Sequence, residues 1–527
     1  MSRKTIKLTG LLLCFSLVLG MLAGCRDGSA APEETVQGTT IGEEIQDIAA
    51  ADNIFSLNSD QDGTFHPYTD TSVLNHMFMP LVFETMYELD GNFVATPKLI
   101  TRAETTDGII WSLYVDTSVK FQDGTGLTAR DVAYSLNRAK LSKEYSGRLS
   151  NLYGVTAMGD DMLMASLYKA DMQFTSLLNL PVVQSGSMDQ TAPVGTGPYM
   201  YNADHTALLL WDEHPQAADM PIDTIYLASY SGPENTISAF ESSLIDLVEN
   251  DPTGMSDLGY GSANEKRYCN TTNLHYIGFN QNSAFFCYPK FRYFLTFAID
   301  RETIVTDSMV GCAVAATLPL SPLSPLYNQS FAQNYGYSME KARNSLKNAG
   351  AEDLDADGLL EFMMGSVVVD IKLKFIVCGD SAVKVAAARN IADKMRDLGL
   401  EVDLQELGWN DYQQALQDGD FDLYYAEVKL SADFNLSSLL LEDGSLNFGK
   451  ISDPGYETYI NDYLASGDDT RQMNCELMCK YLLDTAPIVP ILFEKTEMLT
   501  HRGVVIGASP TQYDVFHNFA DWTINLG

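Results

Sequence analysis

The chain has 527 residues, of which 46% are hydrophobic and 10% aromatic, and its formal net charge is −37. Such an excess of acids repels nucleic-acid phosphates and argues against a nucleic-acid-binding protein, while the length exceeds what one hydrophobic core usually organises. We therefore expect an acidic globular protein of two or more domains. The charge would favour cationic solutes, but it is equally typical of exported proteins in general.

The first 25 residues are typical of a secretory signal. Three cations among the first seven residues precede an apolar run at 8–22, which is shorter than the roughly 20 residues needed to span a membrane. Leu22-Ala-Gly-Cys25 then forms a lipobox, in which the cysteine thiol would carry diacylglycerol with acyl chains such as palmitate. Two such chains give a stable anchor, at roughly 0.8 kcal/mol per buried CH₂. We expect residues 1–25 to be a lipoprotein signal peptide, with Cys25 holding the protein on the outer face of the cell membrane.

The remaining chain divides into a tether and a folded part. Residues 26–52 are rich in Ala, Glu, Gln, Thr and Gly, which predicts a flexible tether. From residue 53 onward, β-like runs alternate with helical patterns, and this alternation predicts an α/β fold. The clearest predicted strands are 110–115 and 367–377, and the clearest helices are 382–398 and 474–483. No later apolar stretch approaches membrane-spanning length.

Residues 111–138 predict a strand, a tight turn and a capped helix. Asp123-Gly124 suits the turn, and Thr128 suits the N-cap of the helix. Asp131, three residues later, can return a hydrogen bond or complement the helix dipole. One apolar helix face would consist of Ala129, Val132, Ala133 and Leu136. No side chain in this segment belongs to a catalytic pattern, so we expect the segment to have a structural role.

The same segment resembles, almost position by position, the signature of the family 5 solute-binding proteins, the dipeptide, oligopeptide and nickel-type receptors of ABC importers. The shared pattern is a Trp-led strand, Lys-Phe-x-Asp-Gly at 120–124, Leu-Thr-Ala-x-Asp-Val at 127–132 and Ser-Leu-x-Arg at 135–138. Further matches follow in the family's order at Thr64–Pro67, Phe83–Met86, Pro97–Leu99, Pro193–Tyr199, Ile277–Asn280, Arg292–Arg301, Gly408–Tyr412, Gly419–Asp422 and Ala486–Pro490. The resemblance spans the chain after the signal and is weakest at 285–297, which is more aromatic than the family pattern.

The resemblance implies a type II periplasmic-binding-protein fold, in which two α/β lobes joined by hinge strands enclose a ligand. Lobe I would be residues 53–275, completed by 491–527, and lobe II would be residues 276–490. It also implies a monomeric receptor that closes on a dipeptide or oligopeptide and delivers it to the permease subunits of an importer. The same fold binding a nickel complex or a sugar is the alternative.

The resemblance also implies a ligand-binding segment around Asp433. In peptide receptors of the family, an Ala-Asp-Tyr-Asn-like segment supplies an Asp that pairs with the peptide ammonium, and Ala-Asp433-Phe-Asn matches it. A strand-end or helix-capping Asp is the alternative interpretation. Leu430 stands where peptide receptors of the family have Trp, so the sequence supports a peptide ligand less strongly than it supports the family. The other candidate ligand-binding residues are Tyr424, Tyr425, Phe434, Asn435 and Trp409, with His275 as a weaker one.

Nothing in the sequence predicts an enzyme or a cofactor. The seven histidines show no HExxH or HxH spacing, and no Gly-x-Ser-x-Gly pattern precedes a helix. A hydrolase whose residues meet only in the folded chain is the alternative from another class. Residues 353–358 resemble the start of a calcium loop, but Met364 stands where that loop needs a bidentate Glu. We predict a surface turn there and no metal site.

The six cysteines after Cys25 show neither a CxxC spacing nor a close-set disulfide framework. They are Cys269, Cys287, Cys312, Cys378, Cys475 and Cys479. We expect small core residues or free thiols, with disulfides left open.

Overall fold

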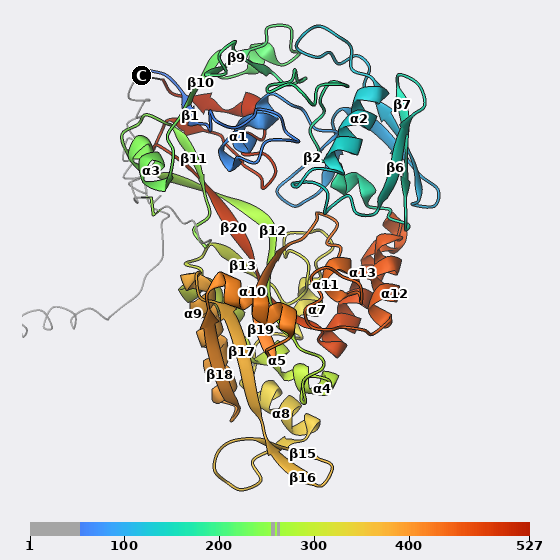
Figure 1. Cartoon of the computed structure of the whole chain (residues 1–527), viewed down its shortest axis with the longest axis vertical. Helices are drawn as coiled ribbons and strands as arrows, with labels where there is room; N and C mark the ends of the chain where they lie inside the picture. Colours follow the sequence, from blue (N-terminus) through green and yellow to red (C-terminus); the bar gives the residue numbers. More distant parts are fainter. Residues whose placement is uncertain (1–52, 254–258, 261–263, 527) are drawn as a thin grey trace, which may run out of the picture. The chain divides into compact units, whose positions relative to one another are not determined.

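The computed structural model describes residues 53–253, 259–260 and 264–526, so the predicted signal peptide, Cys25 and the tether lie outside the described residues. Within the described part, no helix is both long and apolar enough to cross a membrane. The main element is an eleven-stranded sheet in the order β18-β17-β19-β12-β20-β11-β1-β10-β9-β8, with β13 also paired to β20 (Figure 1). In chain order these strands are β1 (Ser56–Asn58), β8 (Tyr199–Tyr201), β9 (Ala207–Leu210), β10 (Thr224–Ala228), β11 (Leu247–Asn250), β12 (Glu265–Phe279), β13 (Ala313–Ala315), β17 (Lys372–Cys378), β18 (Glu401–Leu407), β19 (Leu423–Lys429) and β20 (Ile488–Thr500).

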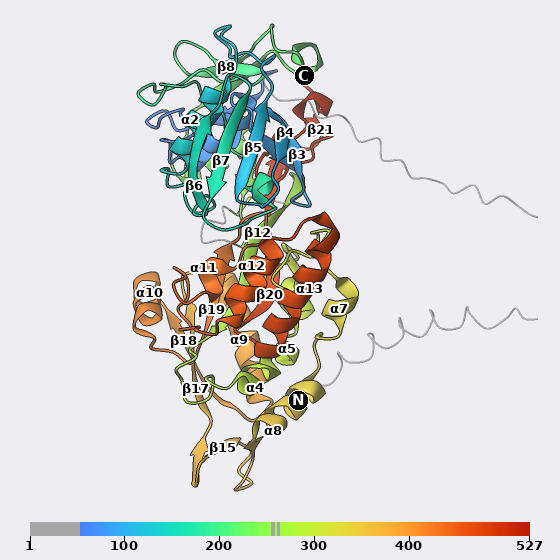
Figure 2. The same cartoon turned by 90° about the vertical axis from the view of Figure 1, so that its right-hand side faces the viewer.

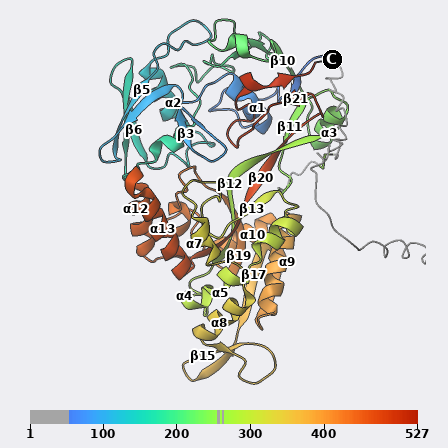
Figure 3. The same cartoon turned by 180° about the vertical axis from the view of Figure 1, so that it is seen from behind.

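β12 and β20 connect the two halves of this sheet. They are the longest strands and pair antiparallel from Glu265↔Thr500 to Gly278↔Ile488, with register shifts in β12 around residues 271–276. Figures 1 and 3 show both strands running from one group of elements to the other. We call residues 53–253 and 501–526 the first lobe, residues 280–487 the second lobe, and β12 with β20 the hinge strands. The limits expected from the sequence, 275/276 and 490/491, fall inside these strands and remain a proposal.

The first lobe carries a separate antiparallel sheet in the order β4-β5-β7-β6, packed against α2 (Figure 2). The elements are β4 (Ile100–Glu104), β5 (Ile110–Val115), α2 (Ala129–Ala139), β6 (Leu152–Ala157) and β7 (Met162–Leu167). The predicted strand at 110–115 and the predicted helix are both confirmed. The Asp131 carboxylate accepts hydrogen bonds from the backbone N–H and the hydroxyl of Thr128, at 3.0 and 2.6 Å.

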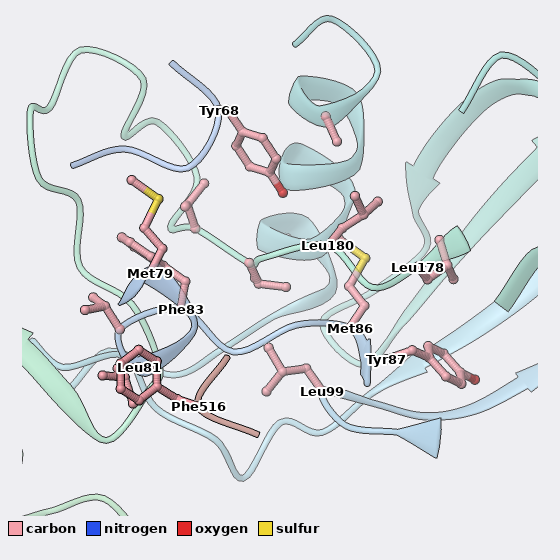
Figure 4. Close-up of a cluster of buried hydrophobic side chains, with 14 of the residues drawn as sticks. Tyr68, Met79, Leu81, Phe83, Met86, Tyr87, Leu99, Leu178, Leu180 and Phe516 are labelled. Atoms are coloured by element: carbon pink, nitrogen blue, oxygen red, sulfur yellow. The ribbon is translucent and has the colours of Figure 1, made fainter. Parts of the chain in front are cut away.

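A large apolar core fills the first lobe. It draws residues from the N-terminal half of the chain and from the last thirty residues, which return to this lobe after β20. Figure 4 shows part of it, where Phe516 from the C-terminal segment lies beside Leu81. The return of the C-terminal segment agrees with the expectation that residues after the second hinge strand complete lobe I. It also brings residues 512–515 to the boundary between the lobes.

The second lobe is built on β17, β18 and β19, with helices around them. The main helices are α8 (Met339–Ala349), α9 (Ala382–Arg396), α10 (Trp409–Asp418), α12 (Gly455–Leu464) and α13 (Asp468–Thr485). The predicted helices at 382–398 and 474–483 are confirmed as α9 and as part of α13. α13 begins six residues earlier than expected, where Asp468 and Asp469 complement the positive end of the helix dipole.

The single strand predicted at 367–377 is wrong, because two strands occupy this range. β16 (Val367–Asp370) pairs with β15 (Glu361–Met364) in an exposed hairpin, whereas β17 pairs with β18 and β19 in the large sheet. Ile371 is buried at the break between them. The continuous β-branched run hid the break, because β16 exposes its valines while β17 buries its apolar residues.

The acidic segment before β15 is an exposed turn, as expected. Asp353, Asp355 and Asp357 are exposed, and Glu361 accepts a hydrogen bond from the N–H of Leu354 at 2.6 Å. The six cysteines are free thiols, five of them buried, in agreement with their interpretation as small core residues.

Candidate ligand-binding cleft

Two adjoining cavities lie between the lobes. One has a volume of about 900 Å³ and the other about 430 Å³. They share Glu144 and Arg148 from the first lobe, Lys429 at the end of β19, and Tyr513 from the C-terminal segment. Because both lobes and the C-terminal segment contribute to the lining, a molecule bound here would touch both sides at once. We call the two cavities together the cleft.

Asp433 lies in the smaller cavity, on the loop between β19 and α11 (Ser437–Leu440). Its Oδ1 accepts hydrogen bonds from the hydroxyl of Ser431 and from the N–H of Asn435, the latter at 3.1 Å. The side chain is only 1% exposed, and among the described residues its Oδ2 has no hydrogen-bond partner. Burial raises the pKa of Asp433, although the two hydrogen bonds oppose that effect. One carboxylate oxygen is thus fixed and the other is left for a donor that the described residues do not supply.

Asp171 lines the same cavity from the first lobe. It follows β7, and its Oδ1 accepts a hydrogen bond from the N–H of Gln173 at 2.7 Å. Its side chain is also 1% exposed. Burial, followed by the charge of Asp433, raises the pKa of Asp171 to about 8, while Arg471 opposes the shift. Two buried carboxyl groups from opposite lobes therefore influence each other in one cavity.

Two cations, Arg148 and Lys429, line both cavities of the cleft, and Lys143 lines the larger one. The Arg148 guanidinium lies 5.2 Å from the ring centre of Tyr145 and 5.7 Å from that of Tyr513, and it donates one hydrogen bond to the carbonyl of Asn179. Lys429 is exposed and shares the cavity wall with it. Rings on either side hold the guanidinium in place while leaving donors free. The cleft can therefore receive negative as well as positive groups of a ligand.

Of the ligand-binding residues expected from the sequence, the structure places Asp433 and Asn435 in the lining of the cleft, together with Leu430. Tyr424, Tyr425 and Phe434 are instead buried in the core of the second lobe and line none of the described cavities. Trp409 is 47% exposed at the start of α10, stacked on Tyr412, and is likewise absent from the cleft lining. We therefore carry only Asp433 and Asn435 forward as candidate ligand-binding residues.

His275 belongs to a buried polar network in the hinge rather than to the cleft. Its Nδ1 lies 2.8 Å from the hydroxyl of Tyr425, and its Nε2 lies 2.5 Å from Glu494 Oε1. Asn273 and Thr253 donate further hydrogen bonds to Glu494, at 3.0 and 2.9 Å. Burial opposes ionisation of Glu494, but the contact with His275, the hydrogen bond from Asn273 and the charge of Lys384 together outweigh it and lower the pKa of Glu494. The network ties β12, β19 and β20 together where the lobes join.

Asp171, Arg148 and Tyr513 were missed by reasoning from the sequence. Each follows or precedes a regular element in a short polar stretch, and nothing in its local pattern distinguishes it from a surface residue. An indirect signal was available in the expectation that the C-terminal segment returns to lobe I, since that return places Tyr513 beside the cleft.

Comparison with known proteins agrees with this architecture. Residues 95–439 match the profile of the bacterial extracellular solute-binding proteins, family 5 Middle. The oligopeptide-binding protein AppA of Bacillus subtilis is 24% identical over 345 residues, a match covering 60% of this chain and 62% of AppA. The periplasmic oligopeptide-binding protein OppA of Salmonella typhimurium is 23% identical over 459 residues, covering 78% of this chain and 81% of OppA.

Solved structures show the same fold. AppA of Bacillus subtilis in complex with a nonapeptide aligns with a TM-score of 0.61 and 18% identity, covering 89% of this chain and 98% of AppA. The nickel ABC transporter protein of Bacillus halodurans aligns with a TM-score of 0.70 and 20% identity, covering 88% of this chain and 97% of that protein. The two-lobed α/β fold expected from the sequence is thereby confirmed.

Proposed function

Because this chain belongs to family 5 of the bacterial extracellular solute-binding proteins, we propose that it is the receptor of an ABC importer and captures peptides in the cleft between its lobes. The observation that carries the proposal is the cleft itself, which both lobes line and in which Asp433 presents a buried carboxylate oxygen without a partner among the described residues. A peptide ammonium supplies the missing donors and the missing charge. The names of AppA and OppA, both oligopeptide-binding proteins, support this ligand class.

The cleft suits a peptide in three respects. Its size accommodates several residues, its acidic end meets an amino terminus, and Arg148 with Lys429 offers partners for a carboxylate. A ligand that contacts both lobes binds the closed arrangement better than an open one and so shifts the population toward closure. The permease subunits of the importer would then recognise the closed receptor. The protein would bind as a monomer and release its ligand unchanged, without turnover.

The proposal includes attachment to the membrane through Cys25. The lipobox at 22–25 supports an extracytoplasmic lipoprotein, with residues 26–52 as its tether. Replacing Cys25 by Ala is expected to abolish labelling by a fatty-acid probe in cells. Equal labelling of the variant and the wild type would contradict the anchor without affecting the binding proposal.

Calorimetric titration tests the ligand class. Alanine-based peptides of two, three, five and nine residues should bind stoichiometrically, and small-angle scattering should show a smaller radius of gyration at saturation. If no peptide binds but a nickel–histidine complex does, the proposal of an importer receptor stands and the proposal of a peptide ligand fails. The relation to the nickel protein of Bacillus halodurans makes this the second candidate.

A further inference from the structure

The cleft holds more buried negative charge than one ammonium anchor requires. Asp171 comes from the first lobe and Asp433 from the second, each is 1% exposed, and both line the 430 Å³ cavity. Among the described residues, Arg471 is the cation whose charge favours the ionised form of Asp171, and its side chain pairs with the exposed Asp468 at 3.2 Å. Two buried carboxyl groups without a dedicated cation repel each other once both are ionised, and the raised pKa of Asp171 delays that ionisation.

The C-terminal end of α12 holds the two carboxyl-bearing segments against each other. The carbonyl of Leu464 accepts a hydrogen bond from the N–H of Met172, the residue after Asp171, at 2.8 Å. The hydroxyl of Tyr463, the residue before Leu464, donates to the carbonyl of Asp433 at 2.8 Å. Adjacent residues of α12 thus bind both segments. Figures 1 and 3 show α12 and α13 against the end of the β6–β7 pair from which Asp171 emerges.

The unpartnered Oδ2 of Asp433 shows that this arrangement is built for a donor. Asp433 is held on its Oδ1 side by Ser431 and Asn435, so the loop fixes the carboxylate without using its second oxygen. A primary ammonium has three donors and one positive charge, which matches two carboxylates in one cavity better than it matches one. The raised pKa of Asp171 agrees with a site that is short of positive charge.

We propose that Asp171 and Asp433 together form a two-carboxylate site for the ligand ammonium, so that the ligand's charge joins two lobes that otherwise repel each other. This inference rests on the proposed peptide function and adds a residue from the first lobe to the site. If Asp433 bound the ammonium alone, the charge of the ligand would contact only the second lobe. With Asp171 opposite, the ammonium contacts both lobes and stabilises only the arrangement in which they meet.

The test compares three variants with the wild type: Asp171→Asn, Asp433→Asn and Asp212→Asn. Asp212 is an exposed residue of the first lobe and serves as the matched control. Each protein is titrated calorimetrically with the tightest binder among the alanine peptides and with its N-acetylated form. Alanine peptides contain no lysine, so an ammonium effect can come only from the amino terminus. Thermal melting confirms that each variant is folded.

Asp171→Asn and Asp433→Asn should each weaken the affinity for the free-amine peptide by at least about 30-fold, which is the effect of truncating one side of a buried charge pair. Both should also reduce the preference for the free over the acetylated peptide, and Asp212→Asn should change neither. Without ligand at pH 8, the Asp171→Asn variant should have a smaller radius of gyration than the wild type in small-angle scattering. The variant lacks the repulsion between the carboxylates of Asp171 and Asp433.

The inference is overturned if Asp171→Asn binds both peptides as the wild type does while Asp433→Asn loses the free-amine peptide. That result would leave the proposed function intact with a single anchor. If the wild type binds no peptide, the proposed function fails and the two-carboxylate site fails with it. If the wild type binds free and acetylated peptide equally, peptide binding stands and the ammonium site does not.

Discussion

The buried Asp171 makes closure of the empty protein depend on pH. Where the lobes meet, the pKa of Asp171 is about 8, against an ordinary value of 3.8. When the lobes separate, its carboxyl group is solvated and returns toward the ordinary value. The closed form therefore binds up to one more proton than the open form between about pH 4 and pH 8. Because the form that binds more protons loses stability as pH rises, closure of the empty cleft should weaken over this range.

The size of this pH effect follows from the shift in the pKa of Asp171. Each pH unit inside the window changes the ratio of closed to open protein by up to tenfold, or roughly 1.4 kcal/mol. Raising the pH from 5 to 7 should thus favour the open form by up to about 100-fold. The raised pKa of Asp433 acts in the same direction, whereas Arg471 opposes the shift of Asp171. A bound ammonium supplies the missing charge, so the liganded protein should show little of this dependence.

Small-angle scattering of the empty protein at pH 5, 6, 7 and 8 measures the effect as an increase in the radius of gyration. Other buried acids of the cleft, such as Glu249, also titrate above their ordinary range. Asp171→Asn isolates the contribution of Asp171, and the variant should show a flatter pH profile than the wild type. A wild-type radius that is constant or falls as pH rises would refute the reasoning, as would identical profiles for the two proteins.

Three further predictions concern the scaffold. Glu494→Gln should cost roughly 1–3 kcal/mol in urea unfolding because it disturbs the hydrogen bonds of a buried carboxylate, whereas Glu406→Gln at an exposed ion pair should cost under about 1 kcal/mol. Equal losses would contradict the importance of the hinge network. Gly195→Ala places a Cβ 1.9 Å from a main-chain oxygen and should cost about 3 kcal/mol or more, while Gly154→Ala meets nothing within 4 Å and should melt within a few degrees of the wild type. Thr272→Val removes a 2.6 Å hydrogen bond to the loop that carries Asp433 and should weaken peptide binding by about 1–3 kcal/mol in calorimetry; unchanged affinity would show that this bond does not support the site.

The sequence predicted the structural elements of the fold better than it predicted the residues of the candidate binding site. The segment 111–138 has a turn glycine, an N-cap pair and a regular apolar face, and each of these is a local property that the structure confirms. Gly124 has a φ of 83°, which suits the predicted turn. The lobe architecture was implied by the family resemblance that such segments carry.

The site was harder to predict because its residues come from distant segments. A motif pointed to Asp433, whereas Asp171 has no local signal, and its proposed role depends on the two lobes meeting in one cavity. Tyr424 and Tyr425 lie in the core and not in the cleft lining for a physical reason. β19 lies inside the large sheet between β17 and β12, so its first three residues are all buried and aromatic side chains there build core.

The loop that carries Asp433 is connected directly to the hinge. In β12 the pairing with β20 is interrupted between Asn270 and Leu274, and there Thr271 binds β20 through its side chain, while Thr272 binds Leu430 through both its side chain and its main chain. Thr271 donates to the carbonyl of Glu494 at 2.8 Å, and Thr272 donates to the carbonyl of Leu430 at 2.6 Å. Side-chain hydrogen bonds tolerate a change of strand angle better than a regular ladder, since a rotamer change can follow the movement. Rotation about the hinge would therefore reposition the Leu430–Asp433 loop, which explains how an ammonium bound to Asp433 can affect the angle between the lobes.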